Sequence, residues 1–212
     1  MPVNGLGRWI RAGIWMLPVF GVLTLLATLT HQPDPATRFE DWSRYVTTKV
    51  FLLSHILGSV AGGAFGILGL VALGAYLAGS RRSGLASAGV VTGVFGQVFI
   101  TAVFGVAIAA QPALGRAFLA GDAAAETMYS EIYGAPLLGV AGAGVLLFSL
   151  GFVLLGWSAA VSGRLPKWAG VCLAVGGPLI GIGGIIFGPS QTVGSLLVLA
   201  AGIAMARDTA IK

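Results

Sequence analysis

The chain has 212 residues, of which 57% are hydrophobic and only 9% are charged. Soluble domains carry about 25% charged residues, so a water-soluble globule of this size is excluded and we expect most of the chain to face lipid. The net charge of +5 does not indicate a nucleic-acid partner, because no basic run is longer than the pair Arg81-Arg82. The single cysteine, Cys172, excludes an intramolecular disulfide and a CxxC redox motif.

Six segments are apolar enough to form membrane-crossing helices, each of which needs roughly 20 apolar residues. In chain order they are 12–30, 50–78, 85–110, 134–161, 168–187 and 191–206. The first follows two arginines, but it is long and no A-x-A cleavage site follows it, so we interpret it as a retained helix and not as a signal peptide. The last two are separated at Gly188-Pro189-Ser190, because proline cannot continue a helical hydrogen-bond ladder; a re-entrant pair is the alternative to a hairpin. The predicted fold is therefore an all-α, polytopic bundle of six transmembrane helices in a single membrane domain, residues 1–212.

The connections between these helices fall into two sets with opposite charge. The N-terminus, the 79–84 and 162–167 connections and the C-terminus contain eight Lys or Arg and one Asp, a sum of +7. The alternate connections contain four Lys or Arg and six Asp or Glu, a sum of −2. The positive-inside rule then predicts that both termini are cytoplasmic. The Ala-, Gly- and Val-rich composition suits a bacterial chain in the cell (plasma) membrane.

Two of the outer connections carry the pattern of short helices. In the first, Asp34-Pro35 is a helix-start signature, and Phe39, Trp42 and Val46 recur at helical spacing. This pattern predicts an interfacial helix with its apolar face toward the membrane.

In the second outer connection, Asp122 is placed to cap a short helix that Gly134 would end. The outer connections also contain the candidates for a ligand-binding outer face: His31, Trp42, Tyr129 and Tyr133. The alternative, which we prefer, is an aromatic belt at the level of the lipid headgroups and a solvent-exposed His31.

A faint internal repeat links the first and second halves of the chain. The segment 68–74, LGLVALG, resembles 150–156, LGFVLLG, and each is followed by a basic connection. This similarity predicts parallel repeats of helical hairpins over 8–84 and 85–167, with 168–212 as a shortened third copy. Chance similarity between apolar segments is the alternative.

Residues that support catalysis are missing from the predicted spans. No Asp, Glu, Lys or Arg falls inside any of them, although proton relays and many ion-coupled transporters need such residues. No HExxH metal motif, Walker lysine loop or G-x-S-x-G elbow occurs either. We therefore predict no catalytic residues and no metal site, and the sequence favours a protein without enzymatic activity.

His55 is the most conspicuous polar residue within the second predicted helix. Small residues follow it on one helical face: Gly58, Ser59, Gly62 and Gly66. A stripe of small residues is typical of a close helix–helix contact, so we expect His55 to point into the bundle. It would serve either as an axial haem ligand or quinone contact, with His31 as a possible second haem ligand, or as a neutral histidine bonded to a neighbouring helix, which we prefer.

Gln97 lies near the expected bilayer midplane in the third helix. It belongs to a ridge of small and polar residues at every fourth position: Gly89, Gly93, Gln97, Thr101 and Gly105. A buried amide costs free energy unless it is paired, so Gln97 either lines a substrate pocket or links helices, the second being our preference. In the fifth helix, Gly177-Pro178 and Gly181 predict a thin, kinked segment that packs closely against its neighbours.

These features support three hypotheses of function. The first is a non-enzymatic helix bundle that binds lipid or a membrane-protein partner, or assembles as a homo-oligomer. The second is a haem- or quinone-binding redox protein that uses His55. The third is a small transporter or channel for an uncharged substrate lined by Gln97. The candidate ligand-binding residues are His55, Gln97, Ser59 and Thr101; lipid is the expected surrounding in every case, and no nucleic acid is expected.

Overall fold

The computed structural model describes residues 3–211, and it describes side chains over residues 7–210. This part of the chain consists of helices and their connections and contains no strand. Two segments, labelled η1 and η2, are π-helical. The elements are α1 (Val3–Ile14), α2 (Met16–Ala27), α3 (Phe39–Val46), α4 (Lys49–Leu53), η1 (Ser54–Ala61), α5 (Gly62–Leu77), α6 (Ser83–Leu119), α7 (Ala124–Ile132), α8 (Ala135–Val161), α9 (Lys167–Pro178), η2 (Leu179–Gly183), α10 (Gly184–Ile186) and α11 (Pro189–Ile211).

Six helical stretches among the described residues are long and apolar enough to cross a membrane, which confirms the predicted all-α bundle of six spans. We number them in chain order as spans 1 to 6: Gly7–Ala27, Lys49–Leu77, Ser83–Leu119, Ala135–Val161, Lys167–Ile186 and Pro189–Ala210. This arrangement is consistent with a multi-pass integral membrane protein.

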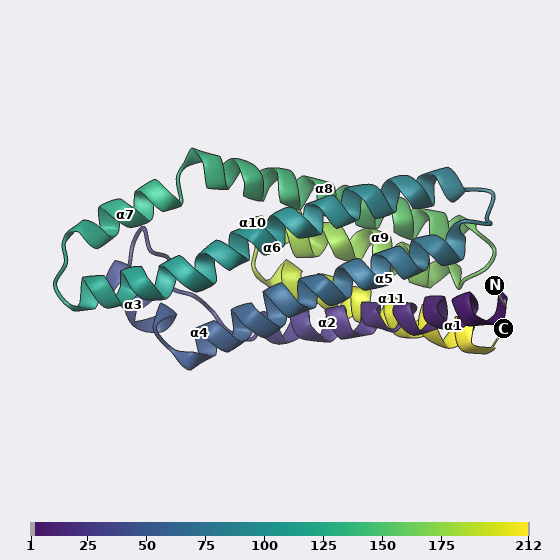
Figure 1. Ribbon diagram of the computed structural model, residues 1–212, viewed down its shortest axis with the longest axis horizontal. Helices are drawn as coiled ribbons and strands as arrows, with labels where there is room; N and C mark the ends of the chain where they lie inside the picture. Colours follow the sequence, from purple (N-terminus) through teal and green to yellow (C-terminus); the bar gives the residue numbers. More distant parts are fainter. Residues whose placement is uncertain (1–2, 212) are drawn as a thin grey trace.

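The contacts between the six spans describe a closed ring in which neighbours in sequence are neighbours in space. Figure 1 shows this bundle from the side. Each span packs against the next one, and α11 of span 6 returns to α2 of span 1. The contact between α6 and α8 is the most extensive. The start of α1 and the end of α11 lie at one end of the ring, here called the terminal end, while α3 and α7 lie at the opposite, distal end.

Proline explains a break in span 1. The helix is interrupted at Trp15, between α1 and α2. Pro18 lies four residues after Ile14, the last residue of α1, and a proline ring removes one hydrogen bond and clashes with the carbonyl four residues earlier. Pro18 therefore accounts for the position of the break.

Span 3 continues far beyond the predicted end at residue 110. α6 runs through Pro112 to Leu119, and its 37 residues correspond to a length of about 55 Å, against about 30 Å for the hydrocarbon core of a bilayer. Tertiary packing holds this extension, because Ser43 O of α3 lies only 2.8 Å from where a Cβ on Gly115 would be. Without these contacts, the low helix propensity of proline would end the helix at Pro112.

The distal end carries a small extra layer, which we call the head: α3, α7 and residues 112–119 of α6. Trp42 and Val46 of α3 are fully buried there with Leu114, and Phe39 and Tyr129 pack against them. The apolar face of α3 therefore packs on α6 and α7 and not on the membrane, contrary to the sequence-based expectation.

The start of α3 also differs from its predicted signature. Asp34 accepts a hydrogen bond from the Ala36 backbone N–H at 2.9 Å, which forms a turn, and the helix begins only at Phe39. The second signature agrees with the structure, because Asp122 accepts a hydrogen bond from Ala124 N at 2.9 Å where α7 begins.

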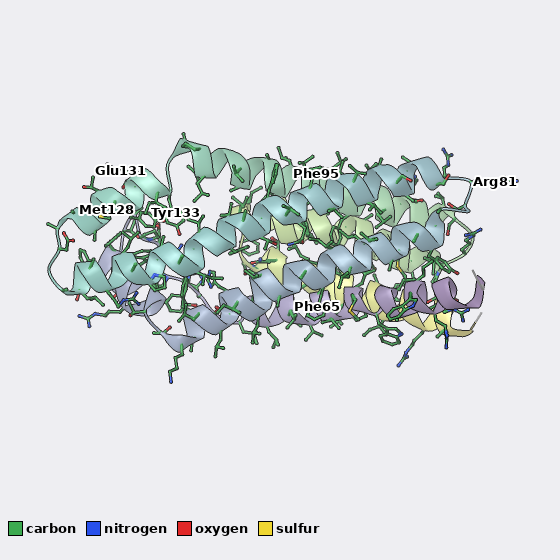
Figure 2. The ribbon with its side chains drawn as sticks, viewed as in Figure 1. Phe65, Arg81, Phe95, Met128, Glu131 and Tyr133 are labelled. Carbon is green, nitrogen blue, oxygen red and sulfur yellow. The ribbon has the colours of Figure 1, made fainter. Side chains whose placement is uncertain are left out.

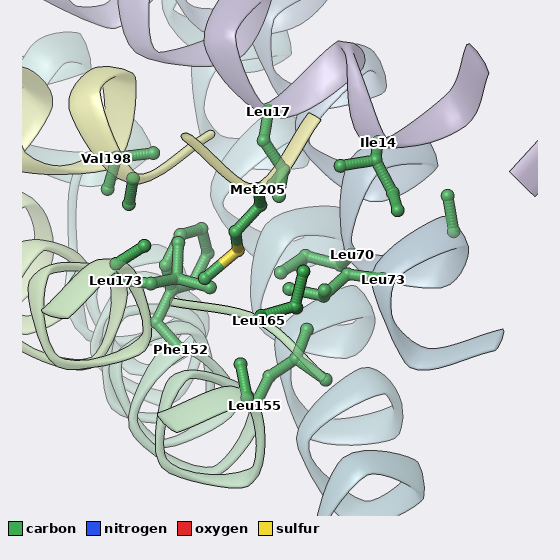
Figure 3. Packing of buried hydrophobic residues seen from close by; sticks show 14 of the residues in the cluster. Ile14, Leu17, Leu70, Leu73, Phe152, Leu155, Leu165, Leu173, Val198 and Met205 are labelled. Carbon is green, nitrogen blue, oxygen red and sulfur yellow. The ribbon is translucent and has the colours of Figure 1, made fainter. Parts of the chain in front are cut away.

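Large side chains fill the terminal half of the ring (Figure 3). Fully buried members of this core include Leu17, Leu70, Leu73, Phe152, Leu155, Leu173, Val198 and Met205. They come from five of the six spans, so side chains fill the centre of the ring in this half. The centre of the distal half, in contrast, contains a cavity.

Candidate functional site

The distal half of the ring contains a partly open cavity of about 240 Å³. All six spans contribute residues to its wall, and none of these residues is charged. The apolar part of the wall includes Phe20, Ile100, Phe104, Val145, Phe148 and Ile180. The polar part consists of Thr24, Ser59, Gln97 and Gln191. An apolar pocket with a few converging polar groups is the usual form of a small-molecule site.

An aromatic cluster closes the cavity on its terminal side. Phe20 and Phe148 line the cavity, and Phe152 lies buried behind them. The ring centroid of Phe152 is 5.9 Å from that of Phe20 and 4.5 Å from that of Phe148. Below this cluster begins the solid core of the terminal half, so the cavity is a pocket that ends inside the bundle.

Both π-helical segments line the cavity. Gly58 and Ser59 belong to η1, and Ile180 and Gly181 belong to η2. The second segment starts directly after Pro178, whose missing N–H favours a local departure from the α-helical ladder. Single π-helical turns within α-helices are rare and occur frequently at functional sites.

Gln97 is the buried polar side chain on this wall. Its side chain is only 4% exposed, and its Oε1 atom has no hydrogen-bond partner among the residues that the structure describes. The opposing residue on α5 is Gly63, where an added Cβ would lie 2.8 Å from Gln97 Nε2. The sequence predicted a partner for this amide, but the residue facing it has no side chain that could supply one.

Two further buried hydroxyls lie near the same cavity without a partner within the described chain. Thr101 Oγ1 shares the space above Gly63 with Gln97. Ser149 Oγ lies 2.8 Å from where a Cβ on the cavity-lining Gly181 would be. Buried polar groups in native proteins are almost always hydrogen-bonded, so these three atoms beside one cavity have hydrogen-bonding capacity that the described residues leave unused.

The four predicted ligand-binding residues are thus separated by the structure. Gln97 and Ser59 line the cavity, and Thr101 lies beside Gln97. His55 is outside the lining: it is half-buried, with its ring centroid 4.1 Å from that of Phe51 and 5.6 Å from that of Phe104. Its Nδ1 atom is 3.0 Å from the Phe51 carbonyl oxygen, a bond within its own span and not to a neighbouring helix.

The predicted outer-face residues do not form one open surface. Trp42 is completely buried, whereas His31 is exposed. Tyr129 and Tyr133 stack with their centroids 4.6 Å apart, and Tyr129 packs edge-on against Trp42. Burial raises the pKa of Tyr133 to about 12 and also raises the pKa of Tyr129. These aromatic residues build the interior of the head.

The predicted packing glycines face neighbouring helices at different distances. Gly58, Gly62 and Gly66 face α2, Gly89 and Gly93 face α8, and Gly177 and Gly181 also face α8. A Cβ on Gly58 would come within 2.6 Å of Ala27 Cβ, whereas one on Gly62 would make an ordinary 3.5 Å contact with Leu23 Cβ. The tightest contact of this stripe is therefore at Gly58, beside the cavity.

Sequence reasoning missed most of the cavity wall. One signal was available for Gln191, which is a second amide in an apolar segment and follows the Gly188-Pro189 break. Phe20 and Phe148 carried no comparable signal, because an aromatic residue in a hydrophobic helix faces lipid as readily as it faces a cavity.

Among the described residues, no group of three or more His, Cys, Asp or Glu side chains is placed to hold a metal ion. Comparison of the chain with protein-family models, with curated protein sequences and with solved structures finds no match. The case for function therefore depends on the cavity itself.

Proposed function

We propose that this protein binds an uncharged, largely apolar molecule in the distal cavity and that Gln97 is the residue that fixes it by a hydrogen bond. The supporting observation is that Gln97 lines the cavity and that its buried Oε1 atom has no hydrogen-bond partner among the described residues. Leaving a buried acceptor unsatisfied costs about 1–3 kcal/mol. A guest that donates a hydrogen bond recovers this free energy.

The chemistry of the wall selects the class of ligand. The lining contains no Asp, Glu, Lys, Arg or His to balance a charge, and transferring an unpaired charge into such a site is costly. The unsatisfied Gln97 oxygen requires a donor, while the nearby Thr101 and Ser149 hydroxyls can donate as well as accept. An uncharged ligand with a hydroxyl or amide group meets these requirements.

The proposal favours binding over two of the alternatives raised by the sequence. A haem site at His55 gains no support from the cavity, because His55 is outside its wall. A channel past Gln97 would need an opening through the aromatic cluster at Phe20 and Phe148, which closes the pocket in this structure. The non-enzymatic, ligand-binding form of the first hypothesis remains, in a protein that resides in the lipid bilayer.

Native mass spectrometry of protein released gently from lipid nanodiscs tests the proposal. We expect the native chain to retain one uncharged organic molecule per chain, identified by extraction and fragmentation. Gln97→Leu, which keeps the side-chain size but removes the acceptor, should weaken retention about 5- to 150-fold, the equivalent of 1–3 kcal/mol.

Gln111→Leu is the matched control. Gln111 is an equally buried glutamine on the same helix, but its oxygen already accepts a hydrogen bond from Gln32 Nε2 at 3.1 Å and it does not line the cavity. It should retain the ligand like the native chain. A native protein that carries no added mass would contradict ligand binding in the cavity, and a Gln97→Leu variant that keeps its ligand as firmly as the native chain would contradict the role of Gln97.

A further inference from the structure

We propose that the ligand is a single-chain membrane amphiphile, which enters the distal cavity sideways from the lipid between α2 and η1. This inference rests on the proposed function and adds the class of the molecule and its route. In the bound state the uncharged head group lies at Gln97 and the hydrocarbon chain lies outside, along the ring.

The size of the cavity indicates that it holds only part of such a molecule. Its volume of about 240 Å³ is below the usual range of about 300–1,000 Å³ for small-molecule sites. A head group and a few methylene groups fit this volume, but a complete long-chain lipid does not.

A second hollow lies next to the cavity and suits the remaining chain. It is a groove of about 290 Å³ between α2 and the α4–η1 segment, with an almost entirely apolar wall. Leu26, Leu53 and Leu57 on this wall are each about half exposed. They belong to spans 1 and 2, so their exposed faces meet lipid and not water. A hydrocarbon chain is the occupant that matches this surface.

Only two small residues separate the groove from the cavity. Ala27 of α2 and Gly58 of η1 are the two residues that line both hollows. Because Gly58 has no side chain, the partition there consists of little more than the Ala27 methyl group. A small displacement of η1 away from α2 joins the two volumes, and the π-helical geometry of η1 places an irregular turn at this point.

The adjoining distal connections are tied more firmly. Thr192 Oγ1 donates a hydrogen bond to Thr28 Oγ1 at 3.0 Å, which links span 6 to the end of span 1. Gln32 Nε2 donates to Gln111 Oε1 at 3.1 Å, which links the segment after α2 to α6. The contact between Ala27 and Gly58 has no such side-chain hydrogen bond. Spans 1 and 2 can therefore separate at this point more easily than the two linked connections can.

A reversible cross-link tests the route. In a Cys172→Ser background, the pair Ala27→Cys and Gly58→Cys places two sulfur atoms across the partition. The Cβ positions are 2.6 Å apart, so the two helices must separate by about 1 Å to reach the usual disulfide spacing of about 3.8 Å. The protein is loaded with dodecan-1-ol, an uncharged single-chain amphiphile, and its exchange for perdeuterated dodecan-1-ol is followed by native mass spectrometry. We expect oxidation to slow exchange at least tenfold and reduction to restore it.

The chain offers a matched control for this cross-link. Gly13 and Ala72 join the same two spans in the terminal half, and a Cβ on Gly13 would also lie 2.6 Å from Ala72 Cβ. The oxidised pair Gly13→Cys and Ala72→Cys should leave exchange unchanged. Equal slowing by both cross-links, or fast exchange through the oxidised Ala27–Gly58 pair, would overturn lateral access while leaving the cavity as the binding site. A reduced protein that binds no dodecan-1-ol would overturn the single-chain amphiphile as the ligand, whereas equal binding after Gln97→Leu would overturn the role of Gln97 in the proposed function.

A second measurement uses the native chain and so does not depend on the folding of the cysteine variants. A dodecan-1-ol analogue with a diazirine near the end of its chain is bound and irradiated, and the modified peptides are mapped. We expect labels on residues 23–30 and 50–58, which contain the groove. Labels confined to other segments would overturn the placement of the hydrocarbon chain.

Discussion

Gln97 can be distinguished from an ordinary interhelical link by the stability of the empty protein. When a hydrogen bond that holds two helices together is removed, the free energy of unfolding of the protein falls. An unsatisfied buried acceptor behaves in the opposite way, because replacing it with an apolar group of similar size removes a desolvation cost. We therefore expect Gln97→Leu to leave the free energy of unfolding of ligand-free protein unchanged or to raise it by about 1 kcal/mol. Unfolding in detergent, followed by circular dichroism, measures this.

Gln111→Leu again provides the comparison. Its side chain makes a hydrogen bond to Gln32, so its replacement should lower the free energy of unfolding by about 1 kcal/mol. If Gln97→Leu destabilised the empty protein as much as Gln111→Leu does, Gln97 would be a structural link and the ligand-binding role would lose its main support.

At the scale of single residues, the sequence was informative only where a polar side chain interrupts an apolar helix. Gln97 and Ser59 could be selected in this way, and both line the cavity. Phe148 and Phe95 look alike in the sequence, but Phe148 is buried in the wall whereas Phe95 is 55% exposed on the outside of the bundle (Figure 2). In lipid, both faces of a helix are apolar, so periodicity cannot separate inward from outward positions.

At the scale of elements, glycine sets how closely α6 approaches α8. The Cβ that an alanine at Gly96 would carry overlaps the backbone nitrogen of Phe148, whereas Gly105 of the same helix has no atom within 4 Å of its Cβ position. We expect Gly96→Ala to lower the free energy of unfolding by about 1–3 kcal/mol through overpacking. Gly105→Ala should be neutral or stabilising by up to about 1 kcal/mol, because alanine is the better helix former.

Gly96→Ala and Gly105→Ala make the same change, glycine to alanine, in the same helix. The difference between their free energies of unfolding therefore reports the packing of α6 against α8. Thermal unfolding in detergent, with the oligomeric state checked by size-exclusion chromatography, measures both. Equal stability of the two variants would contradict the close α6–α8 contact. A loss of stability in Gly105→Ala alone would place a partner on the exposed face of α6.

Composition was enough to predict the six spans, because each needs only a long apolar run. It was not enough to predict the extension of α6 past Pro112, which depends on contacts with α3, a segment about 70 positions away in sequence. The π-helical segments η1 and η2 were also beyond prediction, although Pro178 marked the region of the second. The proposed hairpin repeats remain a prediction; the first two hairpins each carry one head helix at the distal end, α3 and α7.

At the scale of the whole molecule, the two ends of the ring differ in charge, and the interior is filled by side chains near one end and hollow near the other. The described terminal end carries Arg81, Arg82 and Arg164, and Arg164 donates hydrogen bonds to the carbonyl oxygens of Tyr76 and Gly79 at 3.0 and 2.8 Å. The distal end carries the acidic head, with Glu131 visible at the opposite extreme in Figure 2. The solid half of the ring thus adjoins the basic end, and the cavity and groove adjoin the acidic end.

This asymmetry leads to a prediction about the leaflet from which a ligand comes. The positive-inside rule predicts that the basic end is cytoplasmic, so we expect the cavity and groove to open toward the outer leaflet. In a Cys172→Ser background, Ala123→Cys in the exposed α6–α7 connection should react with a membrane-impermeant maleimide added to intact cells. Gly84→Cys, at an exposed position of the terminal end with no atom within 4 Å of its Cβ position, should react only after the cells are opened. The reverse pattern would invert the topology and assign the groove to the cytoplasmic leaflet, and the amphiphile would then have to come from lipids of that leaflet.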